Sequence, residues 1–274
     1  MALSLSNLKS VRAVSPPRML IYGPPGEGKT TLASEFPGAV FLQIEDGTPG
    51  GIELQSFGKL SSYGQVVEAI QALLNEDHSF TTVVVDSVTE LEKLIFAETC
   101  ARGDDKGNVK ANIEDFGYGK GYVYAQRVTA EFLDGMDALR DVKGMTVVLI
   151  AHSTIERFDD PETASYDRYK IDLHKQIVGA VERDMDCIFL LKKPVVVEKE
   201  ESGFNKERAR AKDTGDVRLM HTIGRPAFVA KNRYGIPSTV RYDLGKGYET
   251  LSPYLPNPQQ THAAPDAAHK REAA

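Results

Sequence analysis

Short apolar runs alternate along the first two thirds of the chain with longer stretches in which apolar residues recur at helical spacing. Val66, Ile70 and Leu73 show this spacing, and so does a second stretch over residues 128–139. Strands that are apolar throughout and are separated by helices are typical of a parallel sheet that helices cover on both faces. The pattern therefore predicts an α/β fold, mainly parallel, with strands at 18–22, 39–44, 81–85, 145–151 and 187–191.

The alternation ends after residue 191. Apolar segments at 195–197, 217–221 and 227–230 follow one another without helical stretches between them, which predicts an antiparallel β extension. From Pro253 onward, prolines are mixed with Ala, Gln and His, a composition that does not favour packing. We expect an N-terminal lead over 1–17, one folded domain over 18–252 and a disordered tail over 253–274.

The first strand leads into a loop with the sequence GPPGEGKT, which matches the phosphate-binding pattern G-x-x-x-x-G-K-[ST]. A helical stretch follows, and its N-terminus would add N–H groups and a positive dipole end. The alternative is a glycine-rich turn that fits the pattern by chance. We expect Lys29 to reach the β- and γ-phosphates of ATP and Thr30 to bind Mg²⁺. The nucleotide would contact Gly23, Pro24, Pro25, Gly26, Glu27, Gly28, Lys29, Thr30 and Thr31.

Asp86 ends the buried run Thr82-Val83-Val84-Val85, as the metal-binding carboxylate of a Walker B strand does. We expect it to hold Mg²⁺ directly or through water. The alternative is an aspartate that only caps the helix beginning at residue 87, and the two roles can coexist.

The residue after Asp86 changes the expected chemistry. This spelling of the phosphate loop is common in AAA+ ATPases, which usually place a catalytic glutamate at the next position, but here that residue is Ser87. The base that activates water must therefore come from elsewhere. Glu45 follows the second strand and would face the γ-phosphate across the carboxyl edge of the sheet. Asp46 is a weaker candidate, and an exposed loop carboxylate without a catalytic role is the alternative.

Several further motifs accompany this site over residues 18–245: EDFGYGKGY at 114–122, AHS at 151–153, YDRY at 166–169 and AKNRYG at 230–235. With the phosphate loop and the Asp86-Ser87 pair, they resemble the phage-encoded RecA-like ATPases of the Sak type, compact single-strand annealing recombinases. The resemblance implies a RecA-like P-loop core, ATP, single-stranded DNA, a homo-oligomeric ring or filament, and cooperation with a single-strand binding protein.

The resemblance also assigns roles to three residues. His152, at the end of the fourth strand, occupies the place of a γ-phosphate sensor, where RecA itself has glutamine. A neutral imidazole can donate one hydrogen bond to a phosphate oxygen, although a lone histidine at a strand end is often unremarkable. Lys231 and Arg233 correspond to cations that reach a neighbouring subunit's γ-phosphate in RecA; surface cations are the alternative. The chain lacks RecA's separate terminal modules, which favours annealing over strand invasion.

The expected DNA contacts lie after His152, where cations alternate with aromatic residues. Such residues bind phosphates and stack on bases in single-strand grooves, but acidic residues occupy the same segment, and a solvated loop over 153–170 is the alternative. A second candidate is the segment 103–122, and the basic stretch 206–212 is most simply a solvated turn. The residues assigned to DNA are Arg157, Arg168, Tyr169 and Lys170.

Composition adds outer limits. The formal net charge of −6 excludes an overall basic coat but not a local basic channel. Cys100 and Cys187 do not form a disulfide framework, no apolar run approaches the roughly 18 residues of a membrane span, and the N-terminus has no signal-peptide core. We expect a cytoplasmic protein without a membrane partner, in the host cytoplasm if phage-encoded.

Taken together, the sequence predicts a DNA-stimulated ATPase that anneals complementary strands. A helicase-loader or regulatory ATPase acting on a protein partner is the second interpretation. A small-molecule phosphotransferase is the third, although no lid motif is recognisable in the sequence.

Overall fold

The structure is a computed structural model that describes residues 15–194, 196–201, 207–212 and 217–256. Within them, a ten-stranded mixed sheet has the order β12-β10-β7-β1-β5-β4-β2-β3, with β11 paired to β7 and β6 to β5, and β8 and β9 form a separate hairpin. The strands are β1 (Arg18–Gly23), β2 (Ala39–Gln43), β3 (Gln55–Lys59), β4 (Thr82–Asp86), β5 (Thr146–Phe158), β6 (Tyr166–Ile171), β7 (Cys187–Lys192), β8 (Val196–Glu201), β9 (Glu207–Lys212), β10 (Arg218–His221), β11 (Lys231–Asn232) and β12 (Thr239–Tyr242).

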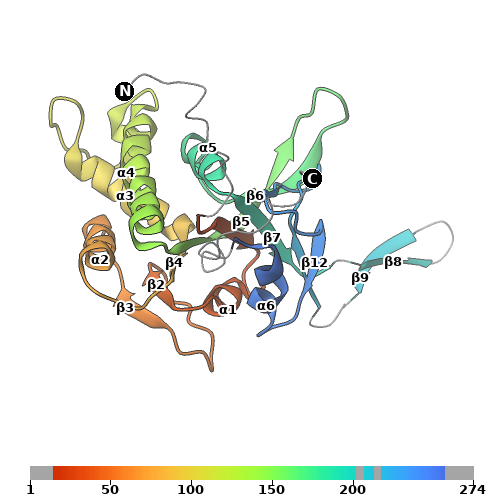
Figure 1. Ribbon diagram of the computed structural model, residues 1–274. Coiled ribbons are helices and arrows are strands. Elements are labelled where there is room, and N and C mark those ends of the chain that lie inside the picture. Colours follow the sequence, from red (N-terminus) through yellow and green to blue (C-terminus); the bar gives the residue numbers. More distant parts are fainter. Residues whose placement is uncertain (1–14, 195, 202–206, 213–216, 257–274) are drawn as a thin grey trace, which may run out of the picture.

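Helices cover both faces of the sheet. Figure 1 shows α2 to α5 on one side and α1 with α6 on the other. The alternation along β1 follows from this arrangement: Leu20 and Tyr22 enter one core, and Met19 and Ile21 enter the other. The helices are α1 (Lys29–Ser34), α2 (Tyr63–Asn75), α3 (Val88–Arg102), α4 (Lys120–Lys143), α5 (Lys175–Asp184) and α6 (Gly247–Leu251), with short 3₁₀ turns η2 (Ile113–Phe116) and η3 (Ser252–Tyr254).

The six strands from β3 to β7 in the sheet order run parallel, and β10 and β12 extend the sheet in antiparallel pairing. The predicted α/β P-loop NTPase fold is thus confirmed. Strand β5 lies between β1 and β4, with Gly23 beside His152 and Asp86 beside Ile150. The phosphate loop, Asp86 and His152 consequently meet at the carboxyl edge of the parallel strands, where α/β proteins place their ligands.

Several predicted boundaries are wrong. Strand β3 was not predicted, because all of its residues are exposed and it has no apolar run. Strand β5 does not end near residue 151: it continues to Phe158 and pairs with β6, so the segment 153–170 is a β-hairpin instead of a solvated loop.

The C-terminal part also differs. Residues 227–230 contain only isolated bridges, from Phe228 to Tyr169 and to Arg225, and strand pairing starts later, at Lys231. The basic stretch 207–212 is strand β9, paired with β8, and not a turn. Residue 206, residue 195, most of the expected lead (1–14) and most of the expected tail (257–274) lie outside the described residues.

In the part of the chain that the structure describes, no helix combines the length and the apolar character needed to cross a membrane.

Candidate functional site: a nucleotide site at the carboxyl edge of the sheet

The phosphate loop depends on glycine at two positions. A Cβ at Gly23 would collide with the backbone carbonyl of Leu191 in the neighbouring strand, so only glycine allows the loop to leave β1 here. Gly28 has φ 87°, in the left-handed region that glycine adopts without strain, and α1 begins at the next residue. The first N–H groups of α1 therefore face the cradle that the loop forms.

Lys29 is buried at the centre of this cradle. Its Nζ donates hydrogen bonds to the backbone carbonyls of Gly23 and Pro24, both at 2.9 Å. Burial lowers the pKa of Lys29, and the nearby carboxylates only partly oppose this effect. An ammonium in this position gains stability from an anion, and a polyphosphate in the loop would supply one.

Thr30 and Asp86 are joined directly. The Thr30 hydroxyl donates to Oδ2 of Asp86 at 2.7 Å. Asp86 is 6% exposed, its burial raises its pKa, and its Oδ1 is buried without a hydrogen-bond partner among the described residues. A hydroxyl and an orphaned carboxylate oxygen at a phosphate loop fit Mg²⁺, which prefers oxygen ligands and shares them with phosphates and water.

Among the described residues there is no group of three or more His, Cys, Asp or Glu side chains that could hold a metal alone. Mg²⁺ bound with a nucleotide takes few protein ligands, since phosphates and water supply the others, and here those ligands would be Thr30 and Asp86.

Glu45 is brought to the same place by the pairing of β2 with β4. The N–H groups of Ile44 and Glu45 donate to the Asp86 carbonyl, at 2.8 and 3.3 Å. Oε2 of Glu45 accepts hydrogen bonds from the Ser87 hydroxyl at 3.2 Å and from Nε2 of His152 at 3.0 Å when that nitrogen carries the proton. Oε1 of Glu45 makes no hydrogen bond to the described residues.

His152 is held from two sides at the end of the parallel part of β5. Its N–H donates to the Thr89 hydroxyl of α3 at 3.0 Å, and its carbonyl accepts from the N–H of Asp172 just after β6. The structure thus brings together Lys29, Thr30, Glu45, Asp86 and His152, as the sequence predicted.

Ser87 has a role that the sequence analysis missed. Its Oγ accepts from the N–H of Glu90 and caps α3, so the cap is Ser87 and not Asp86. The same hydroxyl donates to Glu45. A serine directly before the helix could have predicted the cap from the sequence. The contact with Glu45 could not be predicted in this way, because it depends on the order of the strands in the sheet.

The alternative base, Asp46, points elsewhere. It forms an ion pair with Lys59 and is 80% exposed. Asp46 and Glu45 both line a polar cavity of about 260 Å³ whose other walls include Gln43 and Thr48. The cavity gives water a route to Glu45, whereas the Asp46 carboxylate is engaged in its surface ion pair with Lys59.

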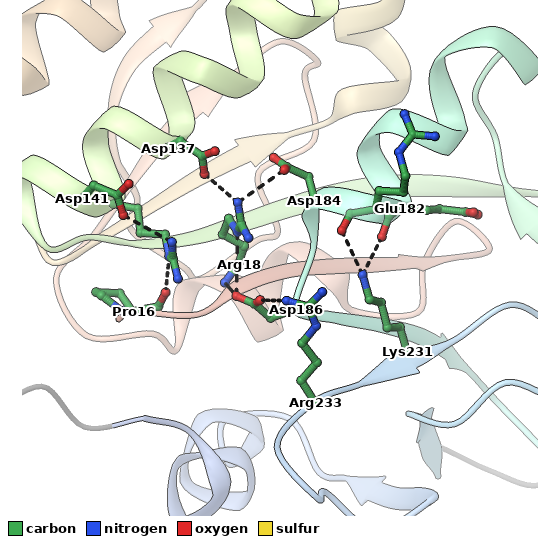
Figure 2. A network of polar contacts seen from close by, with 11 residues as sticks. Pro16, Arg18, Asp137, Asp141, Glu182, Asp184, Asp186, Lys231 and Arg233 are labelled. Carbon is green, nitrogen blue, oxygen red and sulfur yellow. Dashed lines mark hydrogen bonds and ion pairs between the residues drawn. The ribbon is translucent and has the colours of Figure 1, made fainter. Parts of the chain in front are cut away.

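Lys231 and Arg233 lie at the opposite edge of the sheet (Figure 2). Strand β11 pairs with Cys187 and Ile188, the first residues of β7, whereas the phosphate loop follows the last residue of the parallel β1. These cations therefore do not reach the phosphate loop of their own chain.

Both cations have partners within the molecule. Nζ of Lys231 donates to the carbonyls of Glu182 and Arg183, in the last turn of α5, at 2.9 and 3.0 Å. Arg233 forms a 2.8 Å ion pair with the buried Asp186, yet its own side chain is 53% exposed. Lys231 thus satisfies a helix C-terminus, while Arg233 remains accessible at the surface.

Figure 2 also shows why Asp186 is held in place. Its Oδ2 accepts from the backbone N–H of Arg18 at 2.9 Å, and the Arg18 guanidinium bonds to Asp137 at 2.8 Å and to Asp184 at 3.3 Å. Asp186 immediately precedes β7, and the sequence analysis did not single it out. The network fixes the amino edge of β1 and β7.

The residues assigned to DNA lie on the β5–β6 hairpin. Glu156 forms ion pairs with Arg168 at 3.7 Å and with Lys170 at 3.0 Å, and the Arg168 guanidinium lies 3.8 Å from the centre of the Phe158 ring. These side chains share one face of the hairpin.

The other two residues assigned to DNA differ in exposure. Arg157 is exposed, opposite Asp167 in the strand register. Tyr169 is partly buried against the core, and its backbone bonds to Ala227 and Val229.

The second candidate DNA segment, 103–122, is a loop that contains the turn η2 and leads into the first residues of α4. Tyr118 is fully exposed there, and Lys110 lies 5.9 Å from the centre of the Phe116 ring. Lys110 is also 3.7 Å from Asp104. The segment therefore presents aromatic surface, but part of its positive charge is paired within the loop.

Comparison with known families agrees with this geometry. The family model described as an AAA domain matches residues 15–234, which span the sheet from β1 to β11 and include the phosphate loop, Glu45, Asp86 and His152. No curated protein matches the chain. Since the matched region covers most of the chain and carries a complete phosphate-binding loop, the protein belongs to the AAA domain family of nucleotide-binding P-loop ATPases.

Proposed function

We propose that this protein is an ATP-dependent, single-stranded-DNA-binding recombinase that anneals complementary strands, related to the phage RecA-like ATPases of the Sak type. It acts as a homo-oligomeric ring or filament, together with a single-strand binding protein, in the host cytoplasm. One observation carries the proposal: strand β5 holds His152 at the nucleotide site and continues without interruption into the hairpin that bears Arg157 and Arg168.

The proposed chemistry uses the carboxyl edge of the sheet. Lys29 and the loop N–H groups bind the phosphates, and Mg²⁺ on Thr30 and Asp86 supplies further positive charge. Glu45 holds the attacking water through Oε1, because its Oε2 is already fixed by Ser87 and His152. Catalysis of this kind rests on positioning and on charge stabilisation.

The proposed coupling runs along β5. A γ-phosphate near His152 competes with Glu45 for the imidazole N–H, and the main chain of His152 is bonded to Thr89 and Asp172 on either side. Rearrangement at this point is transmitted to the hairpin because both belong to one strand. ATP state and DNA affinity would then change together.

A second function, an ATPase that remodels a protein partner, is favoured by a different observation. Glu156 already pairs with both Arg168 and Lys170, so the hairpin face is less positive than its cation count suggests. A hairpin of this kind can also dock on a protein.

An annealing assay separates the two functions. Two complementary, dye-labelled oligonucleotides are mixed with the protein and with ATP, ADP or no nucleotide, and energy transfer reports duplex formation. The recombinase proposal predicts faster annealing with the protein present and a dependence on nucleotide state. If annealing equals the protein-free rate at all protein concentrations, the recombinase proposal fails and the protein-partner function takes its place.

A further inference from the structure

The carboxyl edge of the sheet continues past the phosphate loop on the side away from Glu45. There, β7, β10 and β12 succeed one another, and because β10 is antiparallel to both neighbours, its first residues meet the last residues of β12. Arg218 pairs in register with Tyr242 at this point. The segments beside them lie at the same edge as the phosphate loop.

A cavity of about 300 Å³ opens between these two strand ends. It borders the phosphate loop directly: a Cβ on Gly28 would lie 3.1 Å from Cδ2 of Leu244 and 3.6 Å from Nε of Arg218. Leu244 is 50% exposed, one of the large apolar side chains that the fold leaves in contact with solvent. The lining residues are Val217, Arg218, Arg241, Asp243 and Leu244.

The wall that carries Leu244 is tied to the helix of the phosphate loop. Glu35, just after α1, accepts hydrogen bonds from the Tyr242 hydroxyl at 2.9 Å, from the N–H of Gly245 at 2.8 Å and from the N–H of Tyr248 at 3.1 Å. Helix α6 consequently lies beside α1 (Figure 1), with Gly247 of α6 against Leu32 of α1. The wall of the cavity that carries Leu244 is therefore tied to the helix that follows the phosphate loop.

The direction of a bound nucleotide follows from the order of the strands. Asp86 ends β4, Glu45 follows β2, and His152 ends the parallel part of β5, all on one side of β1, so the γ-phosphate end points toward them. The opposite end of the molecule must leave the loop toward β7, β10 and β12. That is the side on which the cavity lies.

We propose that this cavity binds the nucleoside half of the nucleotide, with the base against Leu244 and the ribose near Asp243. The Asp243 carboxylate is held at 2.9 Å by Nε of Arg241, and as an acceptor it suits the hydroxyl donors of the ribose. An apolar side chain with a few oriented polar groups is the usual composition of such a subsite. This inference rests on the proposed use of ATP and adds the residues that recognise it.

The test compares ATP with inorganic triphosphate, which has the phosphates but no nucleoside. Equilibrium binding of both is measured for the wild type, for Leu244→Ala and for Ile223→Ala. Ile223 is the matched control, because it is an aliphatic residue of equal exposure (49%) that follows β10 at the other edge of the sheet. Leu244→Ala should weaken ATP binding about tenfold and leave triphosphate binding unchanged, whereas Ile223→Ala should change neither.

Three outcomes overturn the subsite: unchanged ATP affinity in Leu244→Ala, an equal loss for ATP and triphosphate, or a wild type that binds triphosphate as tightly as ATP. A different outcome would overturn the proposed function itself. If the wild type binds neither compound, or if Lys29→Ala binds ATP as well as the wild type does, there is no ATP site for the cavity to complete.

Discussion

Nε2 of His152 lies 3.0 Å from Oε2 of Glu45, although 107 positions separate the two residues in the sequence. The strand order brings them together, because β5 and β2 flank β4 and both reach the phosphate-loop edge. The contact links the proposed base to the proposed γ-phosphate sensor, and it gives the account its most specific consequences.

Replacing Glu45 by Gln should leave ATP binding intact and slow hydrolysis by about 10²-fold or more, because the shape is kept and the negative charge that activates water is lost. Asp46→Asn is the matched control, since Asp46 is a neighbouring carboxylate engaged with Lys59 at the surface. Steady-state ATPase rates and, in a separate experiment, nucleotide affinities are measured for both variants to show which carboxylate is the base. Normal turnover in Glu45→Gln together with an inactive Asp46→Asn would show that Asp46 is the base.

Replacing Asp86 by Asn should stabilise the nucleotide-free protein while impairing Mg²⁺-dependent turnover. Burial raises the pKa of the Asp86 carboxyl, with the Thr30 hydrogen bond and Lys29 offsetting this only in part. A carboxyl whose folded-state pKa is raised loses stability as the pH rises through that pKa. The advantage of Asn should therefore be present at about pH 8 and shrink as the pH falls toward about 4, the ordinary pKa range of aspartate.

Thermal unfolding of the wild type and of Asp86→Asn at the two pH values, without nucleotide, measures this effect. If Asp86→Asn melts at a lower temperature than the wild type at the higher pH, the ionised Asp86 carboxylate does not destabilise the nucleotide-free protein, and the prediction fails.

Opposite effects are expected from two residues of the hairpin. Arg168→Ala should weaken single-stranded DNA binding and lower its salt slope by about 0.7 per lost phosphate contact. Glu156→Gln should strengthen binding, because it releases Arg168 and Lys170 from their ion pairs. Fluorescence anisotropy over a range of salt concentrations gives both quantities. If neither change alters affinity, the hairpin is not the DNA site, and the segment 103–122 becomes the candidate.

Catalysis shared between subunits is testable by mixing variants. Arg233 lies at the edge opposite its own phosphate loop and is half exposed. If it serves a neighbour's phosphates, Arg233→Ala should bind ATP but hydrolyse it poorly, and mixing it with Lys29→Ala should restore part of the activity. Mixing Lys29→Ala with Glu45→Gln is the control and should restore nothing, because both changes fall in the same site. No recovery in oligomers shown to exchange subunits would assign Arg233 to its ion pair with Asp186 alone.

The buried part of the fold was predictable because each central strand is a short, mostly apolar run between helical stretches, and this pattern indicates a strand of a covered parallel sheet. The edge strand β3 was not, since all of its residues are exposed and its pairing is set only by β2. The extension of β5 beyond residue 151 was also missed. Its residues there alternate polar and apolar, and only the pairing with β6 makes them a strand.

The candidate site divides in the same way. The phosphate loop and Asp86 are local patterns, so their places could be predicted from the sequence. The double hydrogen bond that Ser87 and His152 make to one oxygen of Glu45 depends on the order of three strands, and it could not be predicted from spacing. The ion pair of Arg233 with Asp186 joins distant segments and was likewise invisible in the sequence.

The most direct test of the account is the rate of ATP hydrolysis with and without single-stranded DNA, measured for the wild type and for Lys29→Ala. The account predicts hydrolysis that DNA accelerates severalfold in the wild type and that is lost in the variant under both conditions, because Lys29 is the cation buried in the phosphate loop. A wild-type rate that single-stranded DNA leaves unchanged, at DNA concentrations that saturate any binding, would contradict the coupling between the nucleotide site and the hairpin.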